Sequence, residues 1–258
     1  MSKFMFYHCT VYNSNTKGGQ KKPLWKERLE ESFGRLKRSG LYDELEKIHL
    51  LMNCDRDFQE VDVEYYKSDP KIEVRYSKEY ARQETETATW LWDFCNSMKD
   101  NHQIFYDHSK GVMRKTISPP EMCRRVDLWN EYLEYWTMYR WKDCVEALKT
   151  HHTASCFIKH TGGHPIHYCG NVWWANSKYI QMLHKPNEAI DDTVEMWLLS
   201  DLYAKGNSHM GQLDYFKFLR KQHFYSVDQP ILIKDIDNPY DDPIERSTYR
   251  DGDDPEPI

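Results

Sequence analysis

The sequence predicts an α/β domain in which a mostly parallel central sheet is flanked by helices. Strand-like and helix-like segments alternate along most of the chain, which is the pattern of parallel strands connected by helices. The 258 residues, 40% of them hydrophobic, suit one large domain with a sizeable core. The sequence contains no internal repeat of the kind that indicates a solenoid or a propeller.

In the first half of the chain, short apolar runs predict strands and longer periodic stretches predict helices. We expect strands over residues 4–9, 47–54, 61–66, 71–76 and 103–106. Pro23 opens a helix in which Leu24, Leu29 and Phe33 fall near helical spacing, and Gly40 is suited to end it. A second helix is predicted over residues 80–98, and residues 11–22 are predicted to form a polar loop.

The second half continues this alternation to about residue 202. We expect one or two helices over residues 122–148, a strand over 154–159, a loop over 161–165, an extended segment over 168–174 and helices over 176–183 and 192–202. The last residues, 235–258, are acidic and rich in proline, with few apolar anchors. They are predicted to form a loosely held tail after a domain that spans residues 1–234.

The bulk composition excludes some classes of protein. The formal net charge of −6 argues against binding to nucleic acid through phosphate neutralisation alone. No apolar run reaches the length of about 18 residues that a membrane span needs. Seven cysteines stand at irregular spacings without a Cys-x-x-Cys pair, which favours reduced thiols and a cytoplasmic location.

Three segments stand where a parallel sheet places its ligands, at the carboxyl ends of strands. The first is Tyr7-His8. The second is the run from Tyr106 to Gly111, in which Lys110 can neutralise a phosphate while Ser109 and the Gly111 backbone donate hydrogen bonds. Within this run, Asp107 or His108 could bind a divalent ion. The alternative for the second segment is an ordinary polar turn after an edge strand.

The third segment runs from His164 to Trp174 and is rich in histidine and tryptophan. The pair Trp173-Trp174, beside Gly170-Asn171, suits a wall for a sugar or a base. The alternative is a core strand that ends in a tryptophan pair. A zinc site on His164 and His167 would need further ligands, which no clean Cys/His set supplies. Carboxylates that could act as a base are Glu84, Asp127, Asp191, Asp192 and Glu195.

The order of several short strings along the chain is similar to that of a known family. The strings are Ser39-Gly40-Leu41-Tyr42-Asp43, Glu84-x-x-Thr87, Tyr106-x-His108-Ser109-Lys110-Gly111-Val112, His167-x-x-Gly170-Asn171-x-Trp173-Trp174-Ala175, Tyr179-Ile180 and Glu195-x-Trp197. Over residues 3–205 they resemble a family of glycosyltransferase-like proteins of bacteria, large DNA viruses and phages. The resemblance implies a GT-A-type fold, a single Rossmann-like domain that binds a nucleotide sugar at the strand ends.

The resemblance also implies roles for residues of this chain. The donor, a UDP-sugar first of all, would be bound by Tyr7, His8, Glu84, Thr87, Tyr106, Asp107, His108, Ser109, Lys110 and Gly111. The sugar and the acceptor would lie against Gly170, Asn171, Trp173 and Trp174. Glu195 and His167 would be catalytic, with Glu195 as the base for the acceptor hydroxyl.

This sequence departs from the family in ways that bear on metal binding. Such enzymes often hold Mn²⁺ or Mg²⁺ through an Asp-x-Asp pair, and the expected strand end here reads Tyr106-Asp107-His108. Asp107 and His108 could hold the ion unconventionally, or Lys110 could act without one. Cys169 replaces the usual serine, and the polar insertion at residues 11–22 could form a flap over the acceptor.

The expected function is that of a hexosyl- or pentosyltransferase. The acceptor would be a glycan, or a hydroxymethylated base in phage DNA, which would place the protein in the host cytoplasm. Lys17, Lys21, Lys22, Lys26 and Arg28 form a local basic cluster that keeps the DNA acceptor open. The alternatives are a non-catalytic carbohydrate- or nucleotide-binding protein on the same fold and a metal-dependent hydrolase built on the histidines.

Overall fold

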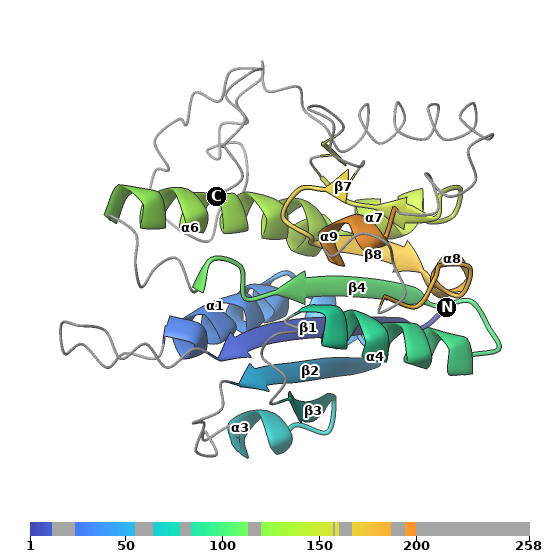
Figure 1. Ribbon diagram of the computed structural model, residues 1–258, viewed down its shortest axis with the longest axis horizontal. Helices are drawn as coiled ribbons and strands as arrows, with labels where there is room; N and C mark the ends of the chain where they lie inside the picture. The colour runs from blue at the N-terminus through green and yellow to red at the C-terminus, as the bar shows by residue number, and fades with distance from the viewer. Residues whose placement is uncertain are drawn as a thin grey trace.

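The central sheet of the protein has six strands in the order β3-β2-β1-β4-β8-β5 (Figure 1). The computed structural model describes residues 1–11, 24–54, 64–77, 84–112, 120–156, 158–159, 167–186 and 194–199. Strands β3, β2, β1 and β4 run parallel, and β8 runs antiparallel to both β4 and β5. The predicted α/β class with a mostly parallel sheet is confirmed.

The described elements alternate along the chain in the predicted manner. The strands are β1 (Lys3–Val11), β2 (Lys47–Cys54), β3 (Ile72–Ser77), β4 (Gln103–His108), β5 (Thr153–Ala154), β6 (Ile158–Lys159), β7 (His167–Tyr168) and β8 (Trp173–Asn176). The helices are α1 (Leu24–Arg38), α2 (Leu41–Glu44), α3 (Glu64–Lys67), α4 (Glu84–Ser97), α6 (Pro120–Glu134), a π-helical turn η2 (Tyr135–Tyr139), α7 (Trp141–Ala147), α8 (Ser177–Ile180) and α9 (Val194–Trp197). None of these helices is long and apolar enough to cross a membrane.

Helices α1 and α4 cover opposite faces of the sheet (Figure 1). Successive residues of a strand point to opposite faces, and β1 shows this directly. Phe6 packs edge-on against Phe94 of α4, with ring centroids 5.3 Å apart, whereas the adjacent Tyr7 packs against Phe33 of α1 at 5.8 Å. The face of the sheet covered by α4 is called the α4 face, and the opposite one the α1 face. A residue on another strand points to the same face as the β1 residue with which it is in register.

Gly40 has the conformation that its predicted role at the end of α1 requires. Its φ is +73°, in the left-handed region that glycine adopts without strain. Its N–H donates to the Lys37 carbonyl at 3.2 Å, and the preceding Ser39 N–H donates to the Arg35 carbonyl at 2.9 Å. These bonds satisfy carbonyl groups in the last turn of the helix.

The predicted strand over residues 61–66 is wrong where the structure describes it, because Glu64–Lys67 forms the helical turn α3. Tyr65 is exposed and Tyr66 is buried against Phe33. An exposed residue followed by a buried one fits both a strand and the edge of a helical turn. The Ser68 hydroxyl donates to the Tyr65 carbonyl at 2.8 Å and so favours the turn over an extended chain.

Two extended segments of the second half are each divided into two strands. The strand predicted over residues 154–159 separates into β5, which pairs with β8, and β6, which pairs with β7 in a small second sheet. The segment predicted over 168–174 is broken at Gly170 and Asn171, whose φ angles are +90° and +51°. The predicted loop at 161–165, most of the insertion at 11–22 and the tail at 235–258 lie outside the described residues.

Candidate functional site

The predicted site residues meet at the carboxyl ends of β1 and β4. His8 and His108 are register partners on these two strands and therefore point to the same face, the one covered by α4. The first turn of α4 brings Glu84 and Thr87 to this point. The site thus combines side chains from two neighbouring strands and one helix, as expected for a parallel sheet.

Glu84 and His108 form an ion pair at the centre of the site. His108 Nδ1 lies 3.0 Å from Glu84 Oε1, and His108 Nε2 lies 2.8 Å from the Gly170 carbonyl oxygen. The other carboxylate oxygen, Oε2, accepts a hydrogen bond from Tyr106 Oη at 3.1 Å and one from Asn171 Nδ2 at 2.6 Å. Both imidazole nitrogens thus face acceptors, so His108 donates from both and is protonated.

The electrostatics of this pair agree with its geometry. Burial opposes charge on both groups, but the proximity of the partner outweighs it. The pKa of Glu84 lies well below its usual value, because the His108 charge and hydrogen bond oppose the effect of burial. For His108, burial lowers the pKa, but the Glu84 carboxylate raises it to above the usual value.

His8 is the neutral neighbour of this charged pair. Its Nδ1 lies 2.9 Å from Thr87 Oγ1, and its Nε2 lies 3.1 Å from Thr10 Oγ1. Burial, with a smaller contribution from the His108 charge, lowers the pKa of His8 to about 4 even though Glu84 acts in the opposite direction. The site therefore holds a neutral and a charged imidazole at one end of two adjacent strands.

The loop after β4 is held in a fixed conformation. Ser109 N–H donates to the His8 carbonyl at 2.8 Å, and Ser109 Oγ accepts the Thr10 N–H at 2.8 Å. Asn130 of α6 donates to the Lys110 carbonyl at 3.1 Å. Gly111 has φ +78°, and a Cβ there would lie 2.1 Å from Val126 Cγ1, so only glycine fits.

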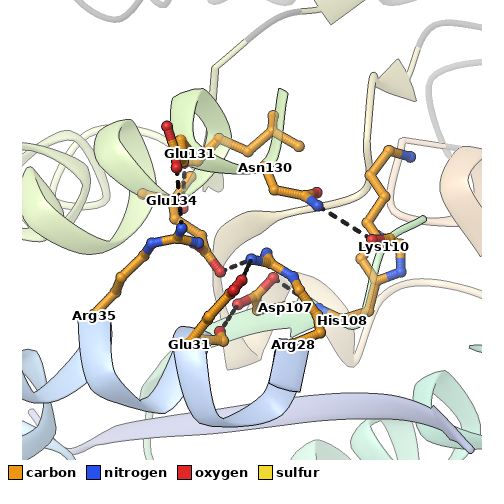
Figure 2. A network of polar contacts seen from close by, with 12 residues as sticks. Arg28, Glu31, Arg35, Asp107, His108, Lys110, Asn130, Glu131 and Glu134 are labelled. Carbon is orange, nitrogen blue, oxygen red and sulfur yellow. Dashed lines mark hydrogen bonds and ion pairs between the residues drawn. The ribbon is translucent and has the colours of Figure 1, made fainter. Parts of the chain in front are cut away.

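Lys110 is the cation of this loop that is available to a ligand. Its ammonium group has no hydrogen-bond or ion-pair partner among the residues that the structure describes. Its charge contributes to the low pKa of Glu84. Figure 2 shows its side chain extending away from Asp107. The sequence-based expectation that this lysine could meet an anion is compatible with its placement.

The turn between β7 and β8 forms the other side of the site. Gly170 donates its N–H to Glu195 Oε1 of α9 at 2.6 Å, while its carbonyl accepts from His108. Asn171 donates to Glu84 and accepts the Trp173 indole N–H at 2.8 Å. Glu195 therefore reaches His108 through the backbone N–H and carbonyl of Gly170, and the third predicted segment also contacts Glu84 directly through Asn171.

Asp107 points away from this site, so the predicted metal pair of Asp107 and His108 is not formed. As successive residues of β4, the two point to opposite faces. Asp107 Oδ2 accepts a hydrogen bond from Ser32 of α1 at 3.1 Å and lies near Arg28 (Figure 2). Burial and the nearby Glu134 carboxylate raise the pKa of Asp107 to about 6, against the opposing effect of Arg28.

Tyr7, Trp173 and Trp174 are core residues in this structure. Tyr7 and Trp174 are fully buried on the α1 face, where Trp174 stacks on Phe105 at 5.0 Å and donates to the Thr137 carbonyl at 2.7 Å. Trp173 is 1% exposed and stacks on Tyr106 at 5.0 Å. The predicted tryptophan wall is thus replaced by the alternative, a core strand, and Trp173 touches the site only through Asn171.

Sequence reasoning missed Asn53, the polar residue near the end of β2. It is fully buried, and neither Nδ2 nor Oδ1 has a hydrogen-bond partner among the residues that the structure describes. Its register partners are Thr10 and Ser77 on the neighbouring strands. A buried amide without partners is costly, and such groups are usually satisfied by protein groups or by ordered water. The only sequence signal was an amide at the end of an otherwise apolar run.

Comparisons with known proteins give a family but no activity. A family model described as "Domain of unknown function (DUF8361)" matches residues 6–225. No curated protein matches the chain. Among solved structures, the chain is similar to a crystal structure of 4-diphosphocytidyl-2C-methyl-D-erythritol synthase, with 9% identity and a TM-score of 0.37, covering 78% of this chain and 84% of that one. A likeness at this level supports no assignment of activity.

Proposed function

The chain belongs to this DUF8361 family, and we propose that it is a glycosyltransferase that moves a sugar from a nucleoside diphosphate sugar to an acceptor hydroxyl. The observation that carries the proposal is the placement of a protonated His108 beside Lys110 at the carboxyl end of β4, where the Lys110 ammonium meets no partner in the described part of the chain. Glycosyl transfer leaves a diphosphate, and cationic groups must hold its developing charge. A UDP-sugar is the first donor to test.

The geometry of the loop after β4 gives its residues different roles toward the diphosphate. Both nitrogens of His108 are engaged by Glu84 and Gly170, so its charge acts on the diphosphate without a direct bond. Lys110 is the side chain that contacts a phosphate oxygen. Ser109 accepts the Thr10 N–H through its oxygen and is within hydrogen-bond reach of the Cys9 thiol, so its role is to hold the loop that carries Lys110.

In this proposal a metal ion, Mn²⁺ or Mg²⁺, enters with the donor. Asp107 and His108 point to opposite faces, so they do not supply the carboxylate pair that would hold such an ion. Because Glu84 already balances the charge of His108, Lys110 carries the net charge compensation in the protein. We expect donor binding to persist when divalent ions are chelated, and Mn²⁺ to strengthen it.

On the acceptor side, the proposal retains a glycan as the first candidate. His167, Cys169 and Glu195 are the titratable groups beside the β7–β8 turn, where an acceptor hydroxyl would lose its proton. A hydroxymethylated base in phage DNA is the second candidate acceptor. Mass spectrometry of nucleosides after incubation of modified DNA with protein and donor separates the two candidates.

Donor binding tests the proposal directly. UDP-, GDP-, CDP- and dTDP-sugars are screened by thermal shift, with and without Mn²⁺. A donor at a hundredfold excess over its Kd stabilises the fold by about 2.7 kcal/mol, which corresponds to a rise in Tm of roughly 5–10 °C. No stabilisation and no hydrolysis by any donor would contradict the proposal.

The variant Lys110→Ala tests whether Lys110 binds the donor. We expect the variant to fold normally and to bind the donor at least about tenfold more weakly, because one charge-assisted bond to a phosphate is lost. Lys149→Ala is the matched control, because Lys149 is an exposed lysine that pairs with Glu146 on α7. Equal donor affinity in both variants would show that Lys110 does not contact the donor.

The absence of a carboxylate pair at the end of β4 favours one other function. A protein that binds a nucleotide sugar without transferring it needs no metal and no base. In that case the donor stabilises the protein, but no nucleoside diphosphate is released with any acceptor or with water. Release of nucleoside diphosphate that depends on Lys110 supports the transferase instead.

A further inference from the structure

We propose that His167, Cys169 and Glu195 form a binding site for a divalent cation of the zinc class. Their ligand atoms, one from each side chain, all lie within 4.8 Å of one another. His167 is 6% exposed, and the other two are half-buried. It is the single group of three potential metal ligands found in the described part of the chain, and it lies apart from Asp107 and His108.

The types of ligand atom point to zinc rather than to magnesium or calcium. A thiolate and an imidazole suit Zn²⁺, whereas Mg²⁺ and Ca²⁺ prefer oxygen ligands. Three protein ligands around an open fourth position is the arrangement of a catalytic zinc site. Bond lengths of about 2.0–2.3 Å place tetrahedral ligand atoms roughly 3.3–3.8 Å apart. The group therefore closes by about 1 Å on binding.

Backbone contacts already hold the three side chains near this geometry. His167 and Cys169 stand two residues apart, His167 on β7 and Cys169 in the turn after it. Glu195 Oε1 accepts the Gly170 N–H at 2.6 Å, which orients the carboxylate, and one of its oxygens lies within 4.8 Å of the other two ligand atoms. Such outer hydrogen bonds to a ligating carboxylate are a regular feature of metal sites.

Helix α9, which carries Glu195, is also anchored. The Trp197 indole donates to the His184 carbonyl at 2.7 Å, and Tyr179 Oη donates to the Leu198 carbonyl at 2.7 Å. The turn on the other side is fixed by the left-handed conformations of Gly170 and Asn171. Both halves of the group thus belong to ordered structure, so little conformational entropy opposes metal binding.

The inference does not rest on the proposed function, and it changes one role within it. A bound cation makes Glu195 a ligand instead of the base for the acceptor hydroxyl. The cation would lower the pKa of a hydroxyl or water in its open position. The inference also extends the zinc site on His164 and His167 considered from the sequence, because Cys169 and Glu195 supply the ligands missing there.

Cobalt substitution tests the site without an activity assay. The full-length protein is stripped with a chelator, and Co²⁺ is titrated in while the visible and near-ultraviolet spectra are recorded. We expect saturation at one equivalent, with a sulfur-to-cobalt charge-transfer band. Cys169→Ser abolishes that band, and His167→Asn and Glu195→Gln each weaken Co²⁺ binding at least about tenfold. Zn²⁺ displaces the cobalt and removes the spectrum.

Cys123→Ser is the matched control, because Cys123 is also a partly exposed thiol and lies outside the group. Circular dichroism confirms that each variant is folded. No saturable binding by the wild type, or a charge-transfer band that survives Cys169→Ser, overturns the inference. Donor-induced thermal shifts in the stripped protein are measured in parallel. Donor binding without cobalt binding contradicts only the metal site, and the reverse result contradicts only the proposed donor site.

Discussion

Gly170 shows how much of the site depends on the conformation of one residue. Its φ of +90° directs its N–H to Glu195 and its carbonyl to His108 within the same turn. A Cβ at this position would lie 2.5 Å from Leu133 Cδ1. Steric conflict with α6 and a disfavoured φ therefore both exclude a side chain.

We predict that Gly170→Ala lowers the free energy of unfolding by about 2–4 kcal/mol, measured by urea denaturation. The control is Gly40→Ala, which has a similar φ of +73° but nothing within 4 Å of the added Cβ. That variant loses only about 1–2 kcal/mol. Equal losses of unfolding free energy in the two variants would show that Leu133 of α6 moves away from the added Cβ at little cost.

At this scale the sequence predicted residue types better than directions. Glu84, His108 and Lys110 were assigned to one site, and the structure brings them to the same end of β4. Asp107 and Trp174 were assigned to it and point to the α1 face. The chemistry of a side chain is visible in the sequence, but the face of the sheet to which it points depends on strand register. Strand β4 is buried on both faces, so its apolar pattern did not show which residues point to which face.

Helices α1 and α6 are joined by a buried ionic cluster on the α1 face (Figure 2). Glu134 is 1% exposed and receives Arg28 at 2.7 Å as well as Arg35. Arg35 also reaches Glu131 at 3.3 Å, nearer to solvent. A buried carboxylate between two arginines is stable only while all partners are present, so this cluster fixes the position of α6 relative to the sheet.

We predict that Glu134→Gln destabilises the protein by about 3–5 kcal/mol, because it removes the buried carboxylate that lies between two guanidinium groups. Glu131→Gln is the control, since its side chain is 31% exposed, and it costs about 1 kcal/mol or less. Chemical denaturation measures both losses. A small loss at Glu134 would indicate that water replaces the carboxylate.

At the scale of elements, the sequence predicted long periodic segments well. The helical region at 122–148 contains α6, η2 and α7, and the strand at 47–54 matches β2. The π-helical turn η2 and the separation of β5 from β6 were not predictable, because both depend on partners far away in the chain. Ser155, for example, donates to the Val172 carbonyl where the chain leaves β5.

The stability of the whole molecule should depend on pH through His8, at the middle of the sheet. Its pKa of about 4 in the folded protein is below the value of about 6.5 for an unfolded chain. Between these values the unfolded chain binds a proton that the folded protein does not. The free energy of unfolding therefore falls as the pH falls from 6.5 towards 4. Asp107, with its raised pKa, acts in the opposite direction between about 4 and 6.

We predict that His8→Gln gains stability relative to the wild type as the pH falls from 7 to 4, by up to about 3 kcal/mol. Denaturation at several pH values measures this difference, and because Asp107 is present in both proteins its contribution cancels. His184→Gln, at an exposed histidine, should show a smaller change. A difference at His8 that stays constant with pH would contradict burial of a neutral imidazole.

For the molecule as a whole, alternation of strands and helices was enough to predict a mostly parallel sheet. The order of the strands and the antiparallel direction of β8 were not predicted. A hydrophobic pattern indicates that a strand is buried, but it does not indicate with which strand it pairs or in which direction. Polar segments at the ends of strands were predicted to lie at one edge of the sheet, and the structure brings His108 and Gly170 together there.

The strand order also determines when the site can form during synthesis. The strands β1, β2, β3 and β4, which pair in parallel, all lie within the first 108 residues. The contact of His8 with Thr87, 79 residues apart, lies within this first part of the chain. Two other contacts of the site need residues 170 and 171: His108 with Gly170, 62 residues apart, and Glu84 with Asn171, 87 residues apart. On a growing chain, the parallel half of the sheet can assemble first, and contacts distant in sequence form later. A nascent chain halted before residue 170 would therefore hold Glu84 and His108 without Gly170, the residue whose backbone links His108 to Glu195.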